Sequence, residues 1–188
     1  MKKVYIVIAA IVIIAGGVAV YLLFAKPGTV NNPLSLANSA FVSSPDISAC
    51  DIATENIAKD LLGKDISKSD NALSSASTDD IAVSICSYST KISASSTSSI
   101  PKISGINILA RIAKTQDGAN SNAQQFQNKP QGTENVTKIG DSAYYNPQFR
   151  QLNVLKAGNW YVVSYYIDSL TNASLATDKQ LAEKLQFQ

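Results

Sequence analysis

The stretch RQLNVLKAGNWYVVSYYI, residues 150–167, predicts a β-hairpin and, with it, an antiparallel sheet. Its Gly158-Asn159 pair suits a two-residue turn of type I′ or II′, with β-branched and aromatic residues on both sides. A turn at these residues places Leu155 opposite Val162. The side chains that then share the better core face are Leu152, Val154, Tyr161, Val163, Tyr165 and Ile167.

Two further strands are expected before this hairpin. IAVSICSY, residues 81–88, and GINILARIA, residues 105–113, both alternate in the period of two that a strand requires. If Cys86 forms a disulfide, both faces of the first strand are covered, which favours helices on each side. The sequence therefore predicts an α+β fold, an antiparallel sheet with helices packed on it, which becomes an α/β/α sandwich if both faces are covered.

Helix signals occur at both ends of the sheet-forming region. Thr54 can cap a helix that ends at Gly63. Thr177 and Gln180 have the spacing of a capping box, so a C-terminal helix is expected to begin there and to pack on the sheet. A short surface helix is expected around residues 119–127.

Two polar segments have no helix or strand pattern. Residues 64–80 are expected to be mostly loop. In residues 89–99, eight of eleven positions are Ser or Thr, which is typical of a solvated surface loop. The alternative for this serine-rich segment is an O-glycosylated or ligand-contacting loop.

The N-terminus predicts one membrane anchor. Residues 4–25 carry no charge and are long enough to span a bilayer core of about 30 Å. Lys2 and Lys3 precede the span, so the N-terminus is expected in the cytoplasm and the remaining chain outside. A cleaved signal peptide is the alternative, although its apolar region is typically shorter. The expected organisation is a cytoplasmic tip and anchor over 1–25, a flexible linker over 26–45 and an extracytoplasmic domain over 46–188.

Cys50 ends the sequence Ile47-Ser48-Ala49-Cys50, which matches the signal for lipidation of a bacterial cysteine. That signal must directly follow the apolar region, yet 24 residues separate Ala25 from Cys50. Two cysteines in an exported domain favour one disulfide, between Cys50 and Cys86. A metal site would need more ligands, and the chain has no histidine.

Charge and composition exclude several functional classes. Without Lys2 and Lys3, 14 basic residues face 14 acidic ones, so no electrostatic attraction to nucleic acid is expected. A serine or cysteine nucleophile needs a positioned base, and the usual base, histidine, is missing. Ser99-Ile100-Pro101-Lys102 and Ser69-Asp70-Asn71 match two elements of penicillin-interacting enzymes, but they occur in the opposite order along the chain. No catalytic residue and no cofactor are therefore expected.

Most of the aromatic residues cluster near the hairpin. Those of the strands are expected to pack against the sheet, as strand aromatics usually do. Tyr144 and Tyr145 lie in GDSAYYNPQF, which has the composition of a loop, and they are the candidates for ligand contact.

The order CDIATENIAKDLLG, CSY, IGDSAYY, LNVLKAGNWYVVSY and LAEKLQ resembles a group of small extracytoplasmic domains of unknown function. These domains occur in Gram-positive envelope lipoproteins and in the external sensor regions of some receptor kinases. The resemblance covers most of residues 46–188. It implies a sandwich of the PsbP type with a Cys50–Cys86 disulfide, and it implies no catalytic residues. This chain differs in using a transmembrane helix instead of a lipid, and it has no cytoplasmic kinase.

Together these features predict a non-enzymatic, single-pass protein of the cell membrane. Its external domain is expected to act in binding or sensing, with an envelope component or a partner protein as ligand. The alternative is a structural subunit of a surface assembly, pilin-like in topology. A third hypothesis, a hydrolase that uses carboxylates, has no motif to support it.

Overall fold

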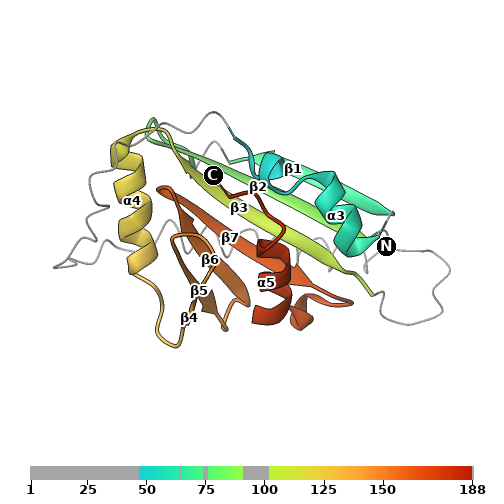
Figure 1. The fold of residues 1–188 in the computed structure, drawn as a ribbon. Helices are drawn as coiled ribbons and strands as arrows, with labels where there is room; N and C mark the ends of the chain where they lie inside the picture. The colour runs from blue at the N-terminus through green and yellow to red at the C-terminus, as the bar shows by residue number, and fades with distance from the viewer. Residues whose placement is uncertain (1–46, 64, 74–75, 91–101, 188) are drawn as a thin grey trace, which may run out of the picture. The chain divides into compact units, whose positions relative to one another are not determined.

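The computed structural model describes residues 47–63, 65–73, 76–90 and 102–187 (Figure 1). The predictions of a membrane span over 4–25 and of a linker over 26–45 lie outside these residues, as does most of the serine-rich segment. Across the described ranges, no helix is both long and apolar enough to cross a membrane.

Within the described residues, seven strands form one antiparallel sheet in the order β1-β2-β3-β7-β6-β5-β4. The strands are β1 (Ile66–Ala72), β2 (Ile81–Thr90), β3 (Gly105–Ala113), β4 (Glu134–Val136), β5 (Ser142–Asn146), β6 (Gln151–Lys156) and β7 (Asn159–Tyr166). The central strands β3 and β7 are almost wholly buried. Helices pack on this sheet, which confirms the α+β class.

The turn of the β6–β7 hairpin lies one residue earlier than predicted. Lys156 pairs with Asn159, so the turn consists of Ala157 and Gly158, at φ of 49° and 79°. Asn159 is not part of the turn but the first residue of β7, where its side chain binds to the neighbouring strand β3. It is fully buried, and its Oδ1 accepts a hydrogen bond of 2.8 Å from the backbone N–H of Ala113.

This change alters the register but not the faces of the hairpin. Leu155 lies opposite Trp160, and not opposite Val162 as predicted. The shift is an even number of residues, so the predicted core face is kept, since side chains alternate with period two. Ile167 is the exception, because it follows the end of β7 and is 43% exposed.

Three helices and the C-terminal end pack on the face that carries the largest core cluster. They are α2 (Ala49–Ile52), α3 (Glu55–Leu62) and α5 (Leu175–Ala182). The cap signals of α3 are confirmed, with Thr54 at its start and Gly63 at its end. α5 begins earlier than predicted, because Ser174 is its N-cap and Thr177 serves as the third residue of that capping box. A short 3₁₀ helix, η2 (Leu170–Asn172), precedes it.

The opposite face carries α4 (Gln116–Gln127), which packs against β3, β7 and β6. In β3, Ile112 lies in the core cluster while its neighbour Arg111 hydrogen-bonds to α4, so the two residues place the helices on different faces. The prediction of a surface helix is therefore only partly right. α4 buries the fully covered Asn122 as well as the expected Ala123 and Phe126.

Three strands, β1, β4 and β5, were missed by the sequence patterns. β1 lies within the segment predicted as loop, and its residues from Ser67 to Ala72 are all exposed. A strand without a buried face has no hydrophobic alternation to reveal it. β5 occupies the part of GDSAYYNPQF that was predicted as loop, and it pairs with β6 and with the three-residue β4.

Candidate functional site

Tyr144 and Tyr145, the predicted ligand contacts, lie next to each other in β5 but point to opposite faces of the sheet. Their exposed fractions are 3% and 7%. Tyr144 lies on the α4 face, with its ring centroid 4.9 Å from that of Phe126. Tyr145 lies opposite Leu152, a member of the core cluster. The two rings therefore do not form a single platform, and each has little surface to offer a ligand.

The aromatic cluster around Tyr144 belongs to the packing of α4. Phe126 lies between Tyr144 and Trp160, with its ring perpendicular to the indole at 6.4 Å. Lys129 places its Nζ 5.9 Å from the centre of the Tyr144 ring, which is within the range of a cation–π contact. The Trp160 indole N–H donates to Asn153 Oδ1 at 3.1 Å, so its polar atom is satisfied inside the sheet.

Arg111 and Asn122 join α4 to the sheet by a buried polar network. Asn122 Oδ1 accepts a hydrogen bond from Arg111 Nε at 3.1 Å, and Asn122 Nδ2 donates to the carbonyls of Arg111 and Gly158, both at 3.0 Å. Burial lowers the pKa of the Arg111 guanidinium, which also lies over Trp160 at 5.6 Å. This network positions α4 and leaves little of Arg111 open to a ligand, since the residue is 7% exposed.

Asp178 is a buried carboxyl in the first part of α5. It is fully buried, and its Oδ1 accepts a hydrogen bond of 2.7 Å from the backbone N–H of Tyr165. No described residue donates a hydrogen bond to its Oδ2. Burial raises the pKa of Asp178 to about 8, although the hydrogen bond from the backbone N–H of Tyr165 acts in the opposite direction.

The pKa of the Tyr145 phenol depends in part on the charge of Asp178. Burial raises the pKa of the Tyr145 phenol, the negative charge of Asp178 raises it further, and the positive charge of Arg150 lowers it. Arg150 itself is exposed, adopts a φ of 54° and donates from Nη1 to the carbonyl of Thr171. Sequence reasoning missed the effect of Asp178 on the pKa of Tyr145. The capping pattern placed Asp178 in the first turn of a helix but said nothing of its burial.

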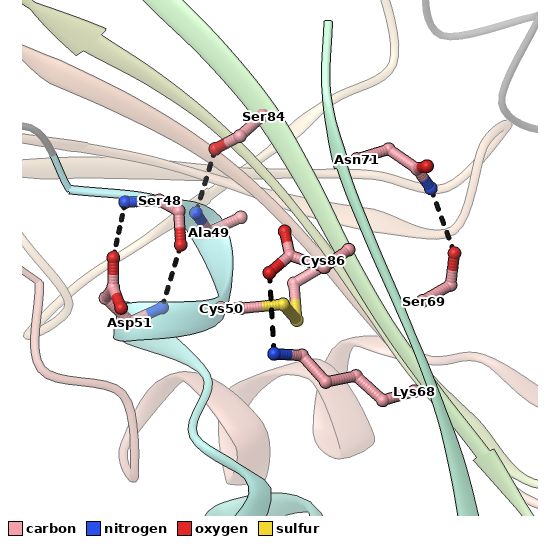
Figure 2. Close-up of a disulfide and its surroundings, with 10 residues drawn as sticks. Ser48, Ala49, Cys50, Asp51, Lys68, Ser69, Asn71, Ser84 and Cys86 are labelled. Carbon is pink, nitrogen blue, oxygen red and sulfur yellow. Dashed lines mark hydrogen bonds and ion pairs between the residues drawn. A yellow bond between two sulfur atoms is a disulfide. The ribbon is translucent and has the colours of Figure 1, made fainter.

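Cys50 and Cys86 form a disulfide, with sulfurs 1.98 Å apart and Cα atoms 5.0 Å apart. It joins α2 to β2, and both residues are buried, at 7% and 0% exposed. A second tie lies beside it, because the backbone N–H of Ala49 donates to Ser84 Oγ at 2.8 Å. Figure 2 shows that these two ties hold the same turn of α2 to the sheet.

The residues that match the lipidation signal form the start of α2. Ser48 is the N-cap, and it exchanges two hydrogen bonds with Asp51 in a capping box. The backbone N–H of Ser48 is the main cause that lowers the pKa of the Asp51 carboxyl. Ala49 is fully buried. The small residues before Cys50 therefore have a structural explanation, helix capping and close packing.

The edge strand β1 is an exposed part of the described surface that is open to a partner. Among the described strands, β1 has only β2 as a neighbour. Its side chains from Ser67 to Ala72 are exposed, and they alternate between charged and uncharged polar types around Ser69. The other edge, β4, has only three residues. Strand edges of this kind recognise partners by adding a further strand to the sheet.

The described residues contain no group of three or more Cys, Asp or Glu placed to hold a metal ion. Comparisons of the chain with models of protein families, with curated proteins and with solved structures found no match. The candidate site therefore rests on the geometry of the domain itself, and the edge strand β1 is its most accessible part.

Proposed function

We propose that this protein is a single-pass membrane protein whose extracytoplasmic domain binds a partner protein or another envelope component without catalysing a reaction. The observation that carries the proposal is the buried Cys50–Cys86 disulfide. Structural disulfides form and persist in oxidising compartments and are rare in the cytosol. A domain that depends on one is expected outside the membrane.

The sequence before the domain supports the same location. Residues 4–25 are uncharged and apolar, and Lys2 and Lys3 precede them. Such a segment inserts with its basic end in the cytoplasm, which places the disulfide domain outside. The linker over 26–45 holds the domain near the membrane surface. In this proposal the domain is a sandwich of the PsbP type, as in the envelope domains that the sequence resembles.

Burial of the tyrosines favours recognition at the surface of the domain over recognition in a cleft. The side chains of Tyr144 and Tyr145 are buried on opposite faces of the sheet, whereas β1 is an exposed polar edge. Strand addition at such an edge uses main-chain hydrogen bonds for affinity and the alternating side chains for specificity. A protein segment in extended conformation suits this edge best.

The location is tested by fusing reporters to the C-terminus of the full chain in bacterial cells. Alkaline phosphatase needs its own disulfides and is active only outside the cytoplasm. We expect an active phosphatase fusion and a dark fusion to green fluorescent protein. A chain without residues 4–25 is the control and should reverse both signals. An inactive phosphatase with a bright fluorescent fusion of the full chain would contradict the proposal.

Binding at the edge is tested by placing a photo-crosslinking amino acid at Ser69 of the full chain in intact cells. Asp117, exposed on α4, is the control position. We expect covalent adducts with an extracytoplasmic molecule from position 69 and few from position 117. Adducts in equal amounts from both positions, or from neither, would show that the edge is not the binding surface.

A further inference from the structure

β1 is a long open edge of the sheet, and most of its side chains are polar. It is seven residues long, and no other described strand lies on its outer side. The backbone groups of alternate residues in such an edge point away from the sheet and can bond to another strand. Six of its seven side chains are exposed. The question is which strand would fit this edge.

The charges of β1 are complementary to those of a second β1. Ser69 is the middle residue of Ile66–Ala72, with Lys68 before it and Asp70 after it. If two copies pair antiparallel about Ser69, Lys68 of each copy lies opposite Asp70 of the other. Opposite charges that face each other across neighbouring strands stabilise their pairing, with Cβ atoms about 4.5–5.5 Å apart.

The other pairs in this register are compatible as well. Ser67 would lie opposite Asn71, and Ile66 opposite Ala72, so all seven residues of the strand would pair. The polar pair Ser67 and Asn71 can form hydrogen bonds across the strands. No like charges meet at any position.

The charged and the uncharged polar side chains of β1 lie on different faces of the strand. Lys68 pairs with Tyr88 and Asp70 with Cys86, so both charges lie on the face of the disulfide. Figure 2 shows Lys68 on that side of the strand and Ser69 and Asn71 on the other. A two-fold axis perpendicular to the sheet keeps every side chain on its own face. The axis must therefore pass beside a residue and not between two residues.

Ser69 is the one centre within β1 that satisfies the charges. An axis at Lys68 or at Asp70 would place like charges opposite each other, which destabilises pairing. An axis at Ser67 or at Asn71 would shorten the overlap and leave one charge of each copy opposite an apolar residue. The midpoint of the strand and the centre of charge complementarity coincide at Ser69, although the two properties are independent.

Charged side chains on an edge often serve to prevent association between sheets. Charges of one sign would do so, because they repel in every antiparallel self-pairing. Lys68 and Asp70 have opposite signs at equal distances from the centre of the strand. Each side chain is also more than 40% exposed, and the pair within the strand is held only at 3.4 Å. Both charges are therefore available to a partner.

We propose that β1 binds β1 of a second copy of this chain, antiparallel about Ser69, so that the two sheets continue into each other. This inference deepens the proposed function, on which it rests, by naming the partner that the edge recognises. The occupant has the same strand, the opposite direction and the complementary charges.

The test is a cysteine at the two-fold axis, Ser69→Cys, in membranes from cells that express the full chain. Both native cysteines are in the disulfide, so the new thiol is the reactive one. At the axis, residue 69 of one copy faces residue 69 of the other, within reach of a disulfide. Ser67→Cys is the matched control. Residue 67 is exposed on the same face, but in this register it lies opposite Asn71 and far from residue 67 of the second copy. We expect mild oxidation to yield at least about ten-fold more covalent dimer from Ser69→Cys.

Charge reversal then tests the register on the Ser69→Cys background. Lys68→Asp gives a strand with two negative charges, and Asp70→Lys gives one with two positive charges. Each variant alone should lose about ten-fold in covalent dimer, because like charges lie opposite each other. Co-expression of the two variants should restore the dimer, as should Lys68→Asp combined with Asp70→Lys in one chain.

Three outcomes would overturn this inference. Equal dimer from Ser69→Cys and Ser67→Cys would mean that the axis is absent. Failure of the mixed charge variants to restore dimer would mean that the register is different. Adducts of position 69 with another envelope protein, without the dimer, would exclude the second copy and leave the proposed binding function intact. Since the substituted side chains are exposed, circular dichroism of each variant should match that of the parent chain.

Discussion

Asp178 is a carboxyl whose burial in the fold raises its pKa far above the ordinary value. Its carboxyl is fully buried at the start of α5, where one oxygen accepts a backbone hydrogen bond and the other accepts none from the described residues. A buried carboxylate without full hydrogen bonding is unfavourable, so the group keeps its proton. Its hydrogen-bond donor is the backbone N–H of Tyr165 in β7, and its negative charge, once formed, raises the pKa of Tyr145.

The pKa of Asp178 predicts a pH dependence of stability with a definite sign. The folded-state pKa is about 8 and the ordinary value is 3.8. Between these values the unfolded chain has lost the proton and the folded chain has kept it. The contribution of Asp178 to the free energy of unfolding therefore falls as the pH rises from about 4 to about 8, and the carboxyl contributes no slope outside this range.

Asp178→Asn removes this slope, because an amide does not titrate. We expect the variant to equal the parent near pH 4 and to exceed it in free energy of unfolding by a few kcal/mol near pH 8. The measurement is urea unfolding of both chains across this pH range. Taking the difference cancels the effects of Asp51 and Asp141, whose pKa values are lowered. A constant difference at all pH values would mean that Asp178 ionises normally.

At the scale of elements, cap residues and strand alternation correctly predicted those features that interactions between residues close in sequence determine. α3 begins and ends at Thr54 and Gly63, as its cap residues indicated. The hairpin of β6 and β7 kept its predicted core face, because alternation decides which side a residue occupies. The position of its turn was predicted wrongly. The buried side chain of Asn159 accepts a hydrogen bond from Ala113 in β3, which is far away in the sequence, and no local pattern contains that information.

β1 and Asp178 were beyond prediction for a related reason. β1 is exposed on both faces, so it lacks the apolar alternation by which strands are recognised. The burial of Asp178 depends on the tertiary packing of α5 against the β6–β7 hairpin, which no pattern within the helix itself encodes. Tyr144 and Tyr145 were assigned to a loop because Gly, Asp, Asn and Pro surround them. Pairing with β6 overrides that composition.

The β6–β7 turn and α4 are in close contact at Gly158. A Cβ added there would lie 2.7 Å from the Cβ of Ala119, and the residue has a φ of 79°. Gly158→Ala is therefore expected to cost about 2–4 kcal/mol, from backbone strain and overpacking together. Gly132→Ala is the matched control, since Gly132 has a φ of 78° and no atom within 4 Å of the added Cβ.

The control should cost about 1 kcal/mol from backbone strain alone. Chemical denaturation of both variants gives the comparison. Equal losses would contradict the close contact of α4 with the turn.

α2 depends on the disulfide more than the sheet does. A helix of four residues is too short to be stable alone, so α2 persists because Cys50 and the Ala49–Ser84 hydrogen bond hold it. Loss of the disulfide is expected to lower the free energy of unfolding by about 3–4 kcal/mol. The local loss should be larger in α2 than in β7.

Hydrogen exchange measures this difference. We compare the parent chain with the Cys50→Ser/Cys86→Ser double variant, in which the amides of residues 49–53 should exchange much faster while those of β7 stay protected. Unchanged protection of α2 would show that packing alone holds it, and uniform loss across the sheet would show that the disulfide is needed for the whole fold.

At the scale of the whole molecule, a domain with one disulfide follows an apolar N-terminal segment. The described part of the domain is one antiparallel sheet with helices on both faces, and residues 46–188 carry 13 basic and 14 acidic residues. Its ionisable interior groups, Asp178 and Arg111, serve packing and do not lie together. The exposed edge of β1 is the surface through which we propose that the domain associates.

The central claim is that the domain resides where Cys50 and Cys86 are oxidised. Its most direct test is the state of the two thiols in the full chain, taken from cells quenched with acid. The denatured protein is treated with an alkylating reagent before and after reduction, and its intact mass is measured. We predict no alkyl group before reduction and one on each cysteine after it. Alkylation of both cysteines without reduction would place the domain in a reducing compartment and contradict the account.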